Sequence, residues 1–256
     1  MRKATMFAAA LTFASALSAA EVLFPQPLHL VRRIDDPVSQ STVTLHEYAA
    51  GNQLITVNGS RVAIADYDKQ QITEIDRAAG TYSVTRFDEV ATSRARVQPA
   101  PKRAAISGES VPKKKWTVSA LSGRSRETFE LKADETQKIE VSVDRRVSLS
   151  RAALEVLIGA AFPNQRGEAH DAILGVAAEQ SGAAQERFGL PMEQDVIWEA
   201  AGEKVVVRSS VVDVTNDLPP ADLLTIPPGA QRVDSRTTRL LRELENLDRI
   251  PGGGKP

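Results

Sequence analysis

The chain has 256 residues, no cysteine, a net charge of −1 and only 5% aromatic residues. The absence of cysteine excludes disulfides, thiol catalysis and thiolate metal sites, so a core of apolar side chains must hold the protein together. The balanced charge provides no basic field for nucleic acid, and the scarcity of aromatic side chains argues against stacking on bases or sugars.

The beginning of the chain has the pattern of a secretory signal peptide over residues 1–20. Arg2 and Lys3 precede an apolar run over residues 4–17, which is too short to span a bilayer, and small residues fit a cleavage site. Because no cysteine follows the run, the lipid-modified cysteine of a lipoprotein is excluded. We expect an exported, periplasmic protein whose charge falls from −1 to −3 when Arg2 and Lys3 are removed. A short membrane anchor is the alternative.

Short alternating runs separated by turn residues predict antiparallel strands in the first third of the chain. The opening strands are predicted at residues 28–31, 43–45 and 54–57. Asn58-Gly59 suits a tight hairpin, because both residues tolerate a positive φ. Residues 61–87 then contain three strands joined by short turns, which is typical of an antiparallel meander.

A basic, proline-rich segment interrupts this pattern. A short helix is predicted over residues 88–96, with acidic residues at its start and arginines at its end. Residues 98–115 contain three prolines and five Lys or Arg against one acid, which indicates a loop rather than a domain boundary. The basic stretch from Arg94 to Lys115 could contact an anionic membrane surface or an envelope protein; a solvated charge run is the alternative. Strands are predicted again at residues 116–120, 129–133 and 139–143.

Residues 148–162 form a predicted helix that is apolar on nearly all sides, because only Arg151 and Glu155 leave a polar stripe. Such a helix must be surrounded by protein. A second apolar helix is expected over residues 168–180. The last elements are strands near residues 196–198 and 205–214, a helix capped by Asp234 or Ser235, and a disordered tail at 251–256.

Together these elements predict an α+β fold in a single domain over residues 21–250. About ten to eleven antiparallel strands would curl into an open half-barrel, with the helices packed in its concave face. A sheet with one apolar face needs a cover, and the helix pair supplies it.

Four segments carry a resemblance to a known family: residues 64–87 (IADYDKQQITEIDRAAGTYSVTRF), 147–151 (VSLSR), 189–192 (GLPM) and 221–233 (ADLLTIPPGAQRV). In these segments and in the order of its elements the chain resembles the periplasmic lipoprotein-carrier superfamily, the carrier and receptor proteins of bacterial lipoprotein sorting, in an uncharacterised branch. The resemblance implies a half-barrel of about eleven strands under a helical lid, with an apolar cavity that takes acyl chains. Unlike those carriers, this chain has few aromatic residues to line such a cavity.

No catalytic or metal motif is found in the sequence. His29, His46 and His170 are far apart along the chain, and we interpret them as isolated side chains rather than metal ligands. Asp66 and Asp68 lack the remaining ligands of a calcium loop, which favours a turn. Residues 110–113 match a Ser-x-x-Lys pattern without its companion motifs. We expect no metal, no cofactor and no enzymatic activity; carboxylates assembled only by the fold are the alternative.

The nearly all-apolar helix facing a one-sided sheet leads to a functional hypothesis: a non-enzymatic exported protein that binds a lipid or lipoprotein acyl chain. The expected apolar lining comprises Trp116, Phe129, Leu131, Ile139, Val141, Leu154, Leu157, Ile158 and Trp198. The alternative is a structural or protein-interaction module of the cell envelope, in which helices and sheet simply fill each other's core.

Overall fold

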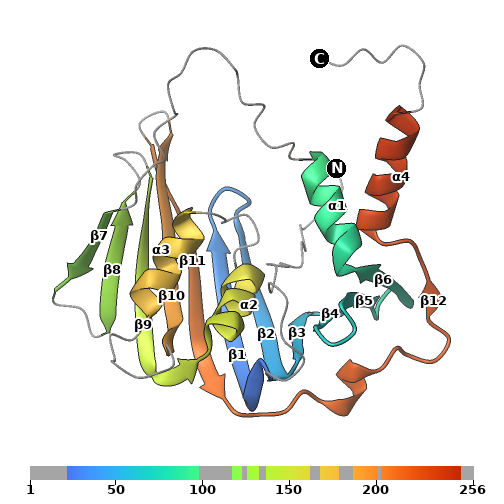
Figure 1. Ribbon diagram of the computed structural model, residues 1–256, viewed down its shortest axis with the longest axis horizontal. Helices are drawn as coiled ribbons and strands as arrows, with labels where there is room; N and C mark the ends of the chain where they lie inside the picture. The colour runs from blue at the N-terminus through green and yellow to red at the C-terminus, as the bar shows by residue number, and fades with distance from the viewer. Residues whose placement is uncertain are drawn as a thin grey trace. The chain divides into compact units, whose positions relative to one another are not determined.

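The computed structural model describes residues 22–97, 117–122, 126–132, 137–161, 168–178, 187–200 and 203–248 (Figure 1). The predicted signal peptide, the basic loop at 98–115, Trp116 and the tail at 251–256 lie outside the described residues. The chain divides into two compact units. Unit 1 comprises Met1–Leu54 and Pro112–Leu218, and unit 2 comprises Ile55–Val111 and Pro219–Pro256.

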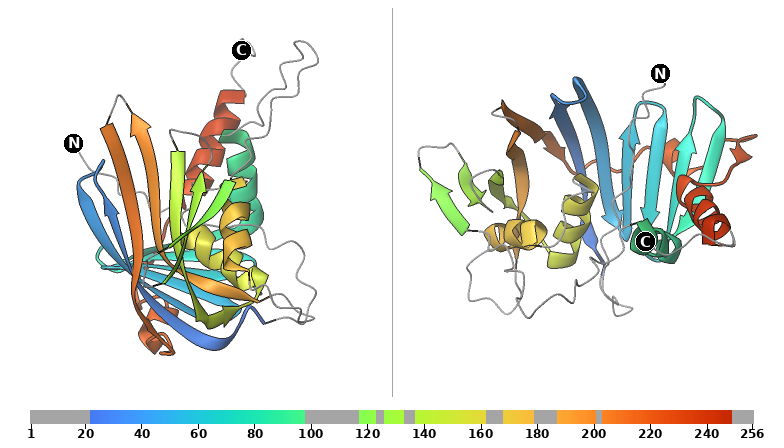
Figure 2. Two further views of the ribbon diagram at one scale, coloured as in Figure 1. Left: turned by 90° about the vertical axis from the view of Figure 1, so that its left-hand side faces the viewer. Right: turned by 90° about the horizontal axis from the view of Figure 1, so that it is seen from above.

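Unit 1 is an antiparallel sheet with two helices. Its strands follow the order β2-β1-β11-β10-β9-β8-β7. Their bounds are β1 Phe24–Asp36, β2 Ser41–Gly51, β7 Thr117–Leu121, β8 Glu127–Lys132, β9 Gln137–Leu149, β10 Phe188–Ala200 and β11 Glu203–Thr215. Helices α2 (Arg151–Ala161) and α3 (Glu168–Ala177) come between β9 and β10 in the chain, and both lie on the same side of this sheet (Figure 2).

Unit 2 contains the predicted meander. Its strands follow the order β12-β6-β5-β4-β3, and the unit boundary cuts β3 after Leu54. Their bounds are β3 Gln53–Asn58, β4 Arg61–Asp66, β5 Gln71–Asp76, β6 Thr81–Arg86 and β12 Gln231–Arg232. Helix α1 (Phe87–Val97) packs against β6 and against α4 (Arg236–Asp248), and a short 3₁₀ helix spans Ala221–Leu224. The two-residue β12 runs parallel to β6 and covers the edge of this sheet.

The α+β class and the mostly antiparallel, open arrangement of strands are therefore confirmed. The described residues form twelve strands, against the predicted ten to eleven, because the sequence shows no periodicity in a strand as short as β12. The meander of β4, β5 and β6 is antiparallel, as expected.

Three hairpin turns share one design; one joins β1 and β2, and the other two join the strands of the meander. An aspartate ends the first strand, and its Oδ1 accepts a hydrogen bond from a backbone N–H three residues later: Ser39 to Asp36 (3.3 Å), Lys69 to Asp66 (2.9 Å) and Ala79 to Asp76 (3.0 Å). The fourth residue after the aspartate takes a positive φ, which is +51° at Gln40, +52° at Gln70 and +62° at Gly80. Gly59 alone takes the positive φ in the Asn58-Gly59 hairpin, at +56°.

The helix starts follow from local capping. Helix α2 begins three residues later than predicted, because residues 148 and 149 still belong to β9. Ser150 then caps α2, since its Oγ accepts the backbone N–H of Ala153 at 3.2 Å. Ser235 caps α4 in the same way, with the N–H of Thr238 donating to its Oγ at 3.0 Å, so the cap predicted at this position is confirmed.

Candidate ligand-binding face

One face of the unit 1 sheet is covered by α2 and α3, and we call it the covered face. Helix α3 packs against β8, β9 and β10, and α2 packs against β10 and α3. Strand register places Phe129 opposite Val141, Val141 opposite Gln194, and Gln194 opposite Ser209, so these four side chains lie in one row. The neighbouring row contains Val118, Leu131, Ile139, Val196 and Val207. The opposite face of β8 and β9 carries Glu130, Lys138 and Glu140, which form partly exposed ion pairs.

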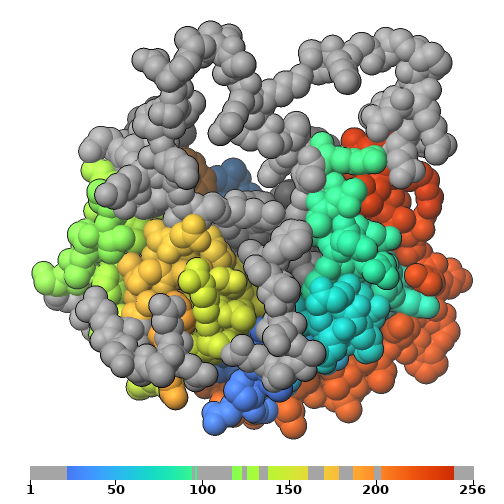
Figure 3. Space-filling view, viewed as in Figure 1, coloured from blue at the N-terminus to red at the C-terminus, as the bar shows by residue number. Residues whose placement is uncertain are grey.

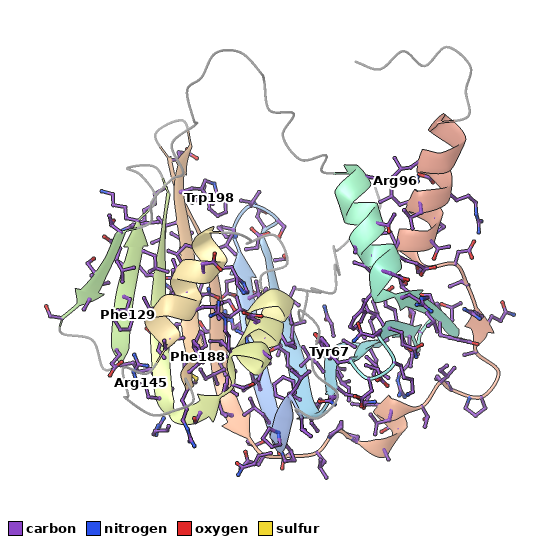
Figure 4. The ribbon with its side chains drawn as sticks, viewed as in Figure 1. Tyr67, Arg96, Phe129, Arg145, Phe188 and Trp198 are labelled. Atoms are coloured by element: carbon purple, nitrogen blue, oxygen red, sulfur yellow. The ribbon has the colours of Figure 1, made fainter. Side chains whose placement is uncertain are left out.

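Eight of the nine predicted lining residues are described, and the five on strands all belong to the covered face. These are Phe129, Leu131, Ile139, Val141 and Trp198. Leu154, Leu157 and Ile158 come from α2. Six of the eight are at most 3% exposed, whereas Phe129 and Trp198, labelled in Figure 4, are half-buried. One side of each helix lies at the surface (Figure 3). Arg151 of α2 and Asp171 and Gly175 of α3 are exposed. The strand register thus places five of the predicted lining residues on the covered face, and α2, which packs on this face, carries three more.

A buried polar cluster interrupts the apolar side chains of the covered face. Its members, which we call the polar quartet, are Arg32 of β1, Glu47 of β2, Ser209 of β11 and Gln194 of β10, with 4%, 1%, 0% and 3% of their surface exposed. Arg32 Nε donates to Glu47 Oε2 at 3.0 Å, and Arg32 Nη1 donates to Ser209 Oγ at 3.4 Å. Glu47 Oε1 and Gln194 Nε2 are buried in the described structure without a hydrogen-bond partner. Arg32 and Glu47 therefore form a buried ion pair without net charge. Two buried polar atoms of the quartet, Glu47 Oε1 and Gln194 Nε2, make no hydrogen bond in the described structure.

The polar quartet was not identified from the sequence, although a signal for part of it was present. Leu28, Leu30 and Arg32 alternate along β1, and Leu45, Glu47 and Ala49 alternate along β2, so each charge stands where a core residue is expected. Two opposite charges on the apolar faces of two successive strands indicate a buried ion pair. For Gln194 and Ser209 the sequence offers no comparable signal.

Arg145 of β9 holds the end of α3 to the sheet. Its guanidinium donates to the carbonyl oxygens of Val176, Ala177 and Ala178 at 3.2, 3.1 and 3.1 Å, and its Nε donates to Glu127 at 2.6 Å. These carbonyls lie at the end of a helix, where no intrahelical donor remains and where a cation is favoured by the helix dipole. Arg145 therefore fixes the position of α3 over the covered face (Figure 4).

Two histidines that the sequence suggested were isolated lie in contact, so that interpretation is wrong for them. His29 Nε2 lies 3.2 Å from His46 Nδ1, because β1 and β2 pair in a register that places these rings diagonally. His29 also stacks on Tyr48 at 4.1 Å, and its Nδ1 lies 3.2 Å from Thr215 Oγ1. Thr215 donates to Asp217 at 2.6 Å. In the tautomer of a neutral His29 ring that fits this contact, Nδ1 donates to Thr215 and Nε2 accepts, which makes His46 Nδ1 the donor between the two rings.

Among the described residues, no group of three or more His, Asp or Glu side chains is arranged to hold a metal ion. The described residues of unit 1 line at least two surface hollows, with volumes of about 430 and 560 Å³. The first is lined by residues that include Asp35, Asp36 and Arg208, and the second by residues that include Arg126, Asp144, Arg145 and Arg146. Neither hollow is lined by any of the nine residues predicted to line the ligand site. The described part of the chain contains no helix long and apolar enough to cross a membrane.

Comparisons with known proteins give no family assignment. No family model and no curated protein sequence matches the chain. Among solved structures it is similar to an uncharacterised conserved protein from Thermus thermophilus, at 8% identity and a TM-score of 0.42, covering 83% of this chain and 92% of that chain. It is also similar to PNGF-II, at 8% identity and TM-scores of 0.36 and 0.34 in two crystal forms, covering 86% and 88% of this chain and 33% of that one. These TM-scores are too low to carry an argument about fold or function.

Proposed function

We propose that the protein is a non-enzymatic, exported binding protein that takes an apolar chain, such as a lipid or lipoprotein acyl chain, between the covered face and the α2–α3 pair. The observation that supports it is the gathering of Leu131, Ile139 and Val141 from adjacent strands under two helices that are themselves buried along most of their surface. A curved, half-barrel form of this sheet would give the chain its channel.

The energetics suit a displacement mechanism. Lifting α2 and α3 exposes the apolar side chains on the covered face and on the helices, and an acyl chain buries the same surfaces again. Each buried methylene contributes about 0.8 kcal/mol, so ten of them contribute roughly 8 kcal/mol. Opening part of a protein costs between about zero and its global free energy of unfolding. The gain from the acyl chain offsets an opening that costs less than this roughly 8 kcal/mol. Resemblance to the lipoprotein-carrier superfamily and the signal-peptide pattern support the same proposal.

The test is the lipid content of the protein from its native host. Mature protein is purified without detergent, extracted with organic solvent and analysed by mass spectrometry. A co-purifying acyl lipid in stoichiometric amount is the expected result. A Leu157→Asp variant, which places a charge between α2 and the sheet, serves as the control and is expected to retain none. A lipid-free extract from the wild-type protein would contradict the proposal.

A second candidate, an interaction module of the cell envelope, is favoured by the tight burial of the covered face. Most residues that line the described hollows of unit 1 are charged or polar. In unit 2, α4 presents half-buried Leu240, Leu241 and Leu244 beside α1. In this case the basic stretch from Arg94 to Lys115, or α4, would contact an envelope protein. A pull-down with the full chain is compared with pull-downs of two variants, one lacking residues 98–115 and one lacking residues 235–248. This function predicts that one of the two variants loses a partner that the full chain binds.

A further inference from the structure

A line of polar contacts crosses the face of the unit 1 sheet that is opposite the covered face. It comprises Asp217, Thr215, His29 and His46, which we call the histidine relay. Thr215 Oγ1 donates to Asp217 Oδ2 at 2.6 Å and lies 3.2 Å from His29 Nδ1, and His29 Nε2 lies 3.2 Å from His46 Nδ1. The centroids of the two imidazole rings are 5.5 Å apart, so the rings meet end to end through these nitrogens. Their contact is therefore a single N–H···N hydrogen bond.

The relay can take up one proton without losing a contact. With both rings neutral, His46 Nδ1 donates to His29 Nε2, and the nitrogen of His46 that keeps a lone pair is its Nε2. A first proton that adds to this Nε2 gives His46 a positive charge and leaves its Nδ1 as the donor. The hydrogen bond to His29 then becomes charge-assisted and is strengthened.

A second proton breaks the contact between the rings. It can add only to His29 Nε2, because Nδ1 of that ring already carries the hydrogen that it donates to Thr215. His29 Nε2 then changes from acceptor to donor and faces the N–H of His46, while two positive charges stand 5.5 Å apart. Histidine is the residue type whose charge ordinarily changes between pH 5 and 8, so acidification is the signal that such a pair can detect.

The groups around the relay give a charged His29 a second partner. Asp217 Oδ2 lies 3.8 Å from His29 Nδ1, close enough to form an ion pair when the ring is charged. Burial and then the charge of Asp217 raise the pKa of the Tyr48 phenol, which stacks on His29, so Tyr48 stays uncharged. The same face carries Asp213 of β11 and Arg33 of β1 in the next rows, and β3 has no titratable side chain.

We propose that the histidine relay is a pH-operated switch in unit 1. One proton strengthens the contact between His46 and His29, and a second proton separates the rings and makes Asp217 the partner of His29. Asp217 follows β11 and precedes Leu218, the last residue of unit 1. At acid pH the switch therefore binds the end of this segment more firmly to β1 and releases the side chain of His46, independently of any ligand on the covered face.

The experiment is a pH titration of the full chain with nitrogen-15 in its histidines, followed through the ring nitrogen and N–H signals in NMR spectra. The chain has three histidines, so His170 serves as the reference. At pH 8, His29 and His46 are both expected to carry their hydrogen on Nδ1. On acidification His46 should become charged while His29 is still neutral, and the Nδ1–H signal of His46 should be lost when His29 becomes charged in turn. Charging of both rings in one step, or of His29 first, would overturn the inference.

Two variants should move the charging of His29 in opposite directions. His46→Ala removes the competing charge and the donor that keeps His29 Nε2 an acceptor, so His29 should become charged at a higher pH than in the wild type. Asp217→Asn removes the carboxylate that favours a charged His29, so the ring should become charged at a lower pH. Where His46→Ala does not fold, as judged by circular dichroism, Asp217→Asn decides alone, because Asp217 is exposed.

Asp171→Asn is the matched control. It removes an exposed carboxylate of α3, which lies on the covered face and not on the face of the relay. The charging of His29 and His46 is expected to follow the wild type in this variant. If His29 became charged at the wild-type pH in both His46→Ala and Asp217→Asn, the relay would be a structural contact only, and the inference would be wrong.

Discussion

Gly189 lies in β10 where the backbones of β9 and β10 approach closely. A Cβ at this position would come within 2.6 Å of Val143 Cγ1 and 3.1 Å of the carbonyl oxygen of Asp144. Gly189→Ala is therefore expected to lower the free energy of unfolding by about 1–3 kcal/mol, measured by urea denaturation. Gly175→Ala, in α3 with no atom near its added Cβ, is the control and should be neutral or stabilising by up to about 1 kcal/mol. Equal stability of the two variants would contradict this close approach.

Gln40 closes one of the three aspartate turns with a φ of +51°, a conformation that costs less for glycine than for any other residue. Gln40→Gly is expected to raise the free energy of unfolding by about 0.5–1 kcal/mol. Gly80→Ala makes the opposite change at the equivalent position of the third turn, where φ is +62°, and should lower the free energy of unfolding by a similar amount. Chemical denaturation measures the free energy of unfolding of both variants. If the two free energies changed in the same direction, the two turns would not share one conformational preference, and the prediction would be wrong.

Asp144 provides a pH-dependent contribution to stability. Hydrogen bonds from Arg146 hold the pKa of this carboxyl at about 2, below its usual value of 3.8. Because the pKa is lowered in the folded state, the contribution is present above pH 4 and disappears as the pH falls through about 2. Asp144→Asn should thus lower the melting temperature at pH 7 and have no effect near pH 2. The free-energy difference should stay below about 1 kcal/mol, because Arg146 is exposed.

Glu203→Gln, at an exposed position at the start of β11, is the control for that pH series. Its melting temperature should follow the wild type at every pH. A difference between Asp144→Asn and the wild type that persists unchanged at pH 2 would assign the effect to lost packing rather than to the charge.

At the scale of elements, a single side chain of β9, that of Arg145, binds the C-terminal carbonyls of α3 in addition to the helix's apolar packing. Arg145→Lys keeps the positive charge but cannot reach the three terminal carbonyls at once, because an ammonium lacks the planar fork of a guanidinium. We expect faster amide hydrogen exchange throughout α3, by about tenfold, and little change in β10. Arg187→Lys is the control, since the hydrogen bond of Arg187 among the described residues is a long one, 3.5 Å to Ser148 Oγ. Unchanged exchange in α3 would show that its apolar side chains alone hold it in place.

Local patterns in the sequence predict most of these elements. The leucine spacing and Ser235 predict α4, and the all-apolar composition of residues 151–161 predicts a buried α2. Contacts set by strand register are different. His29 and His46 are 17 residues apart and meet only because β1 and β2 pair as they do. Ser209 and Gln194 likewise belong to a cluster whose members come from four strands, and nothing in either sequence neighbourhood identifies the others.

On the scale of the whole molecule, the sequence marks the division into two units only in part. One boundary lies within β3, after Leu54, whereas the other two come directly before Pro112 and Pro219, in proline-rich segments. Unit 2 consists of two segments, Ile55–Val111 and Pro219–Pro256, which are separated in the chain by the second segment of unit 1. The two segments of unit 2 are joined where the N–H of Gln231 donates to the carbonyl of Gly80 and the N–H of Val233 donates to that of Tyr82. Long-range pairing of this kind follows from the fold and not from local composition. The proposed binding activity belongs to unit 1 alone.

The central claim is that an apolar chain enters between the covered face and α2–α3, and Trp198 reports on it directly. The protein has two tryptophans, so Trp116→Phe leaves only Trp198, which is half-buried on the covered face. Titration of this variant with a brominated fatty acid should quench its fluorescence saturably, because bromine quenches only on contact. Trp198 fluorescence that stays constant throughout the titration would contradict the account.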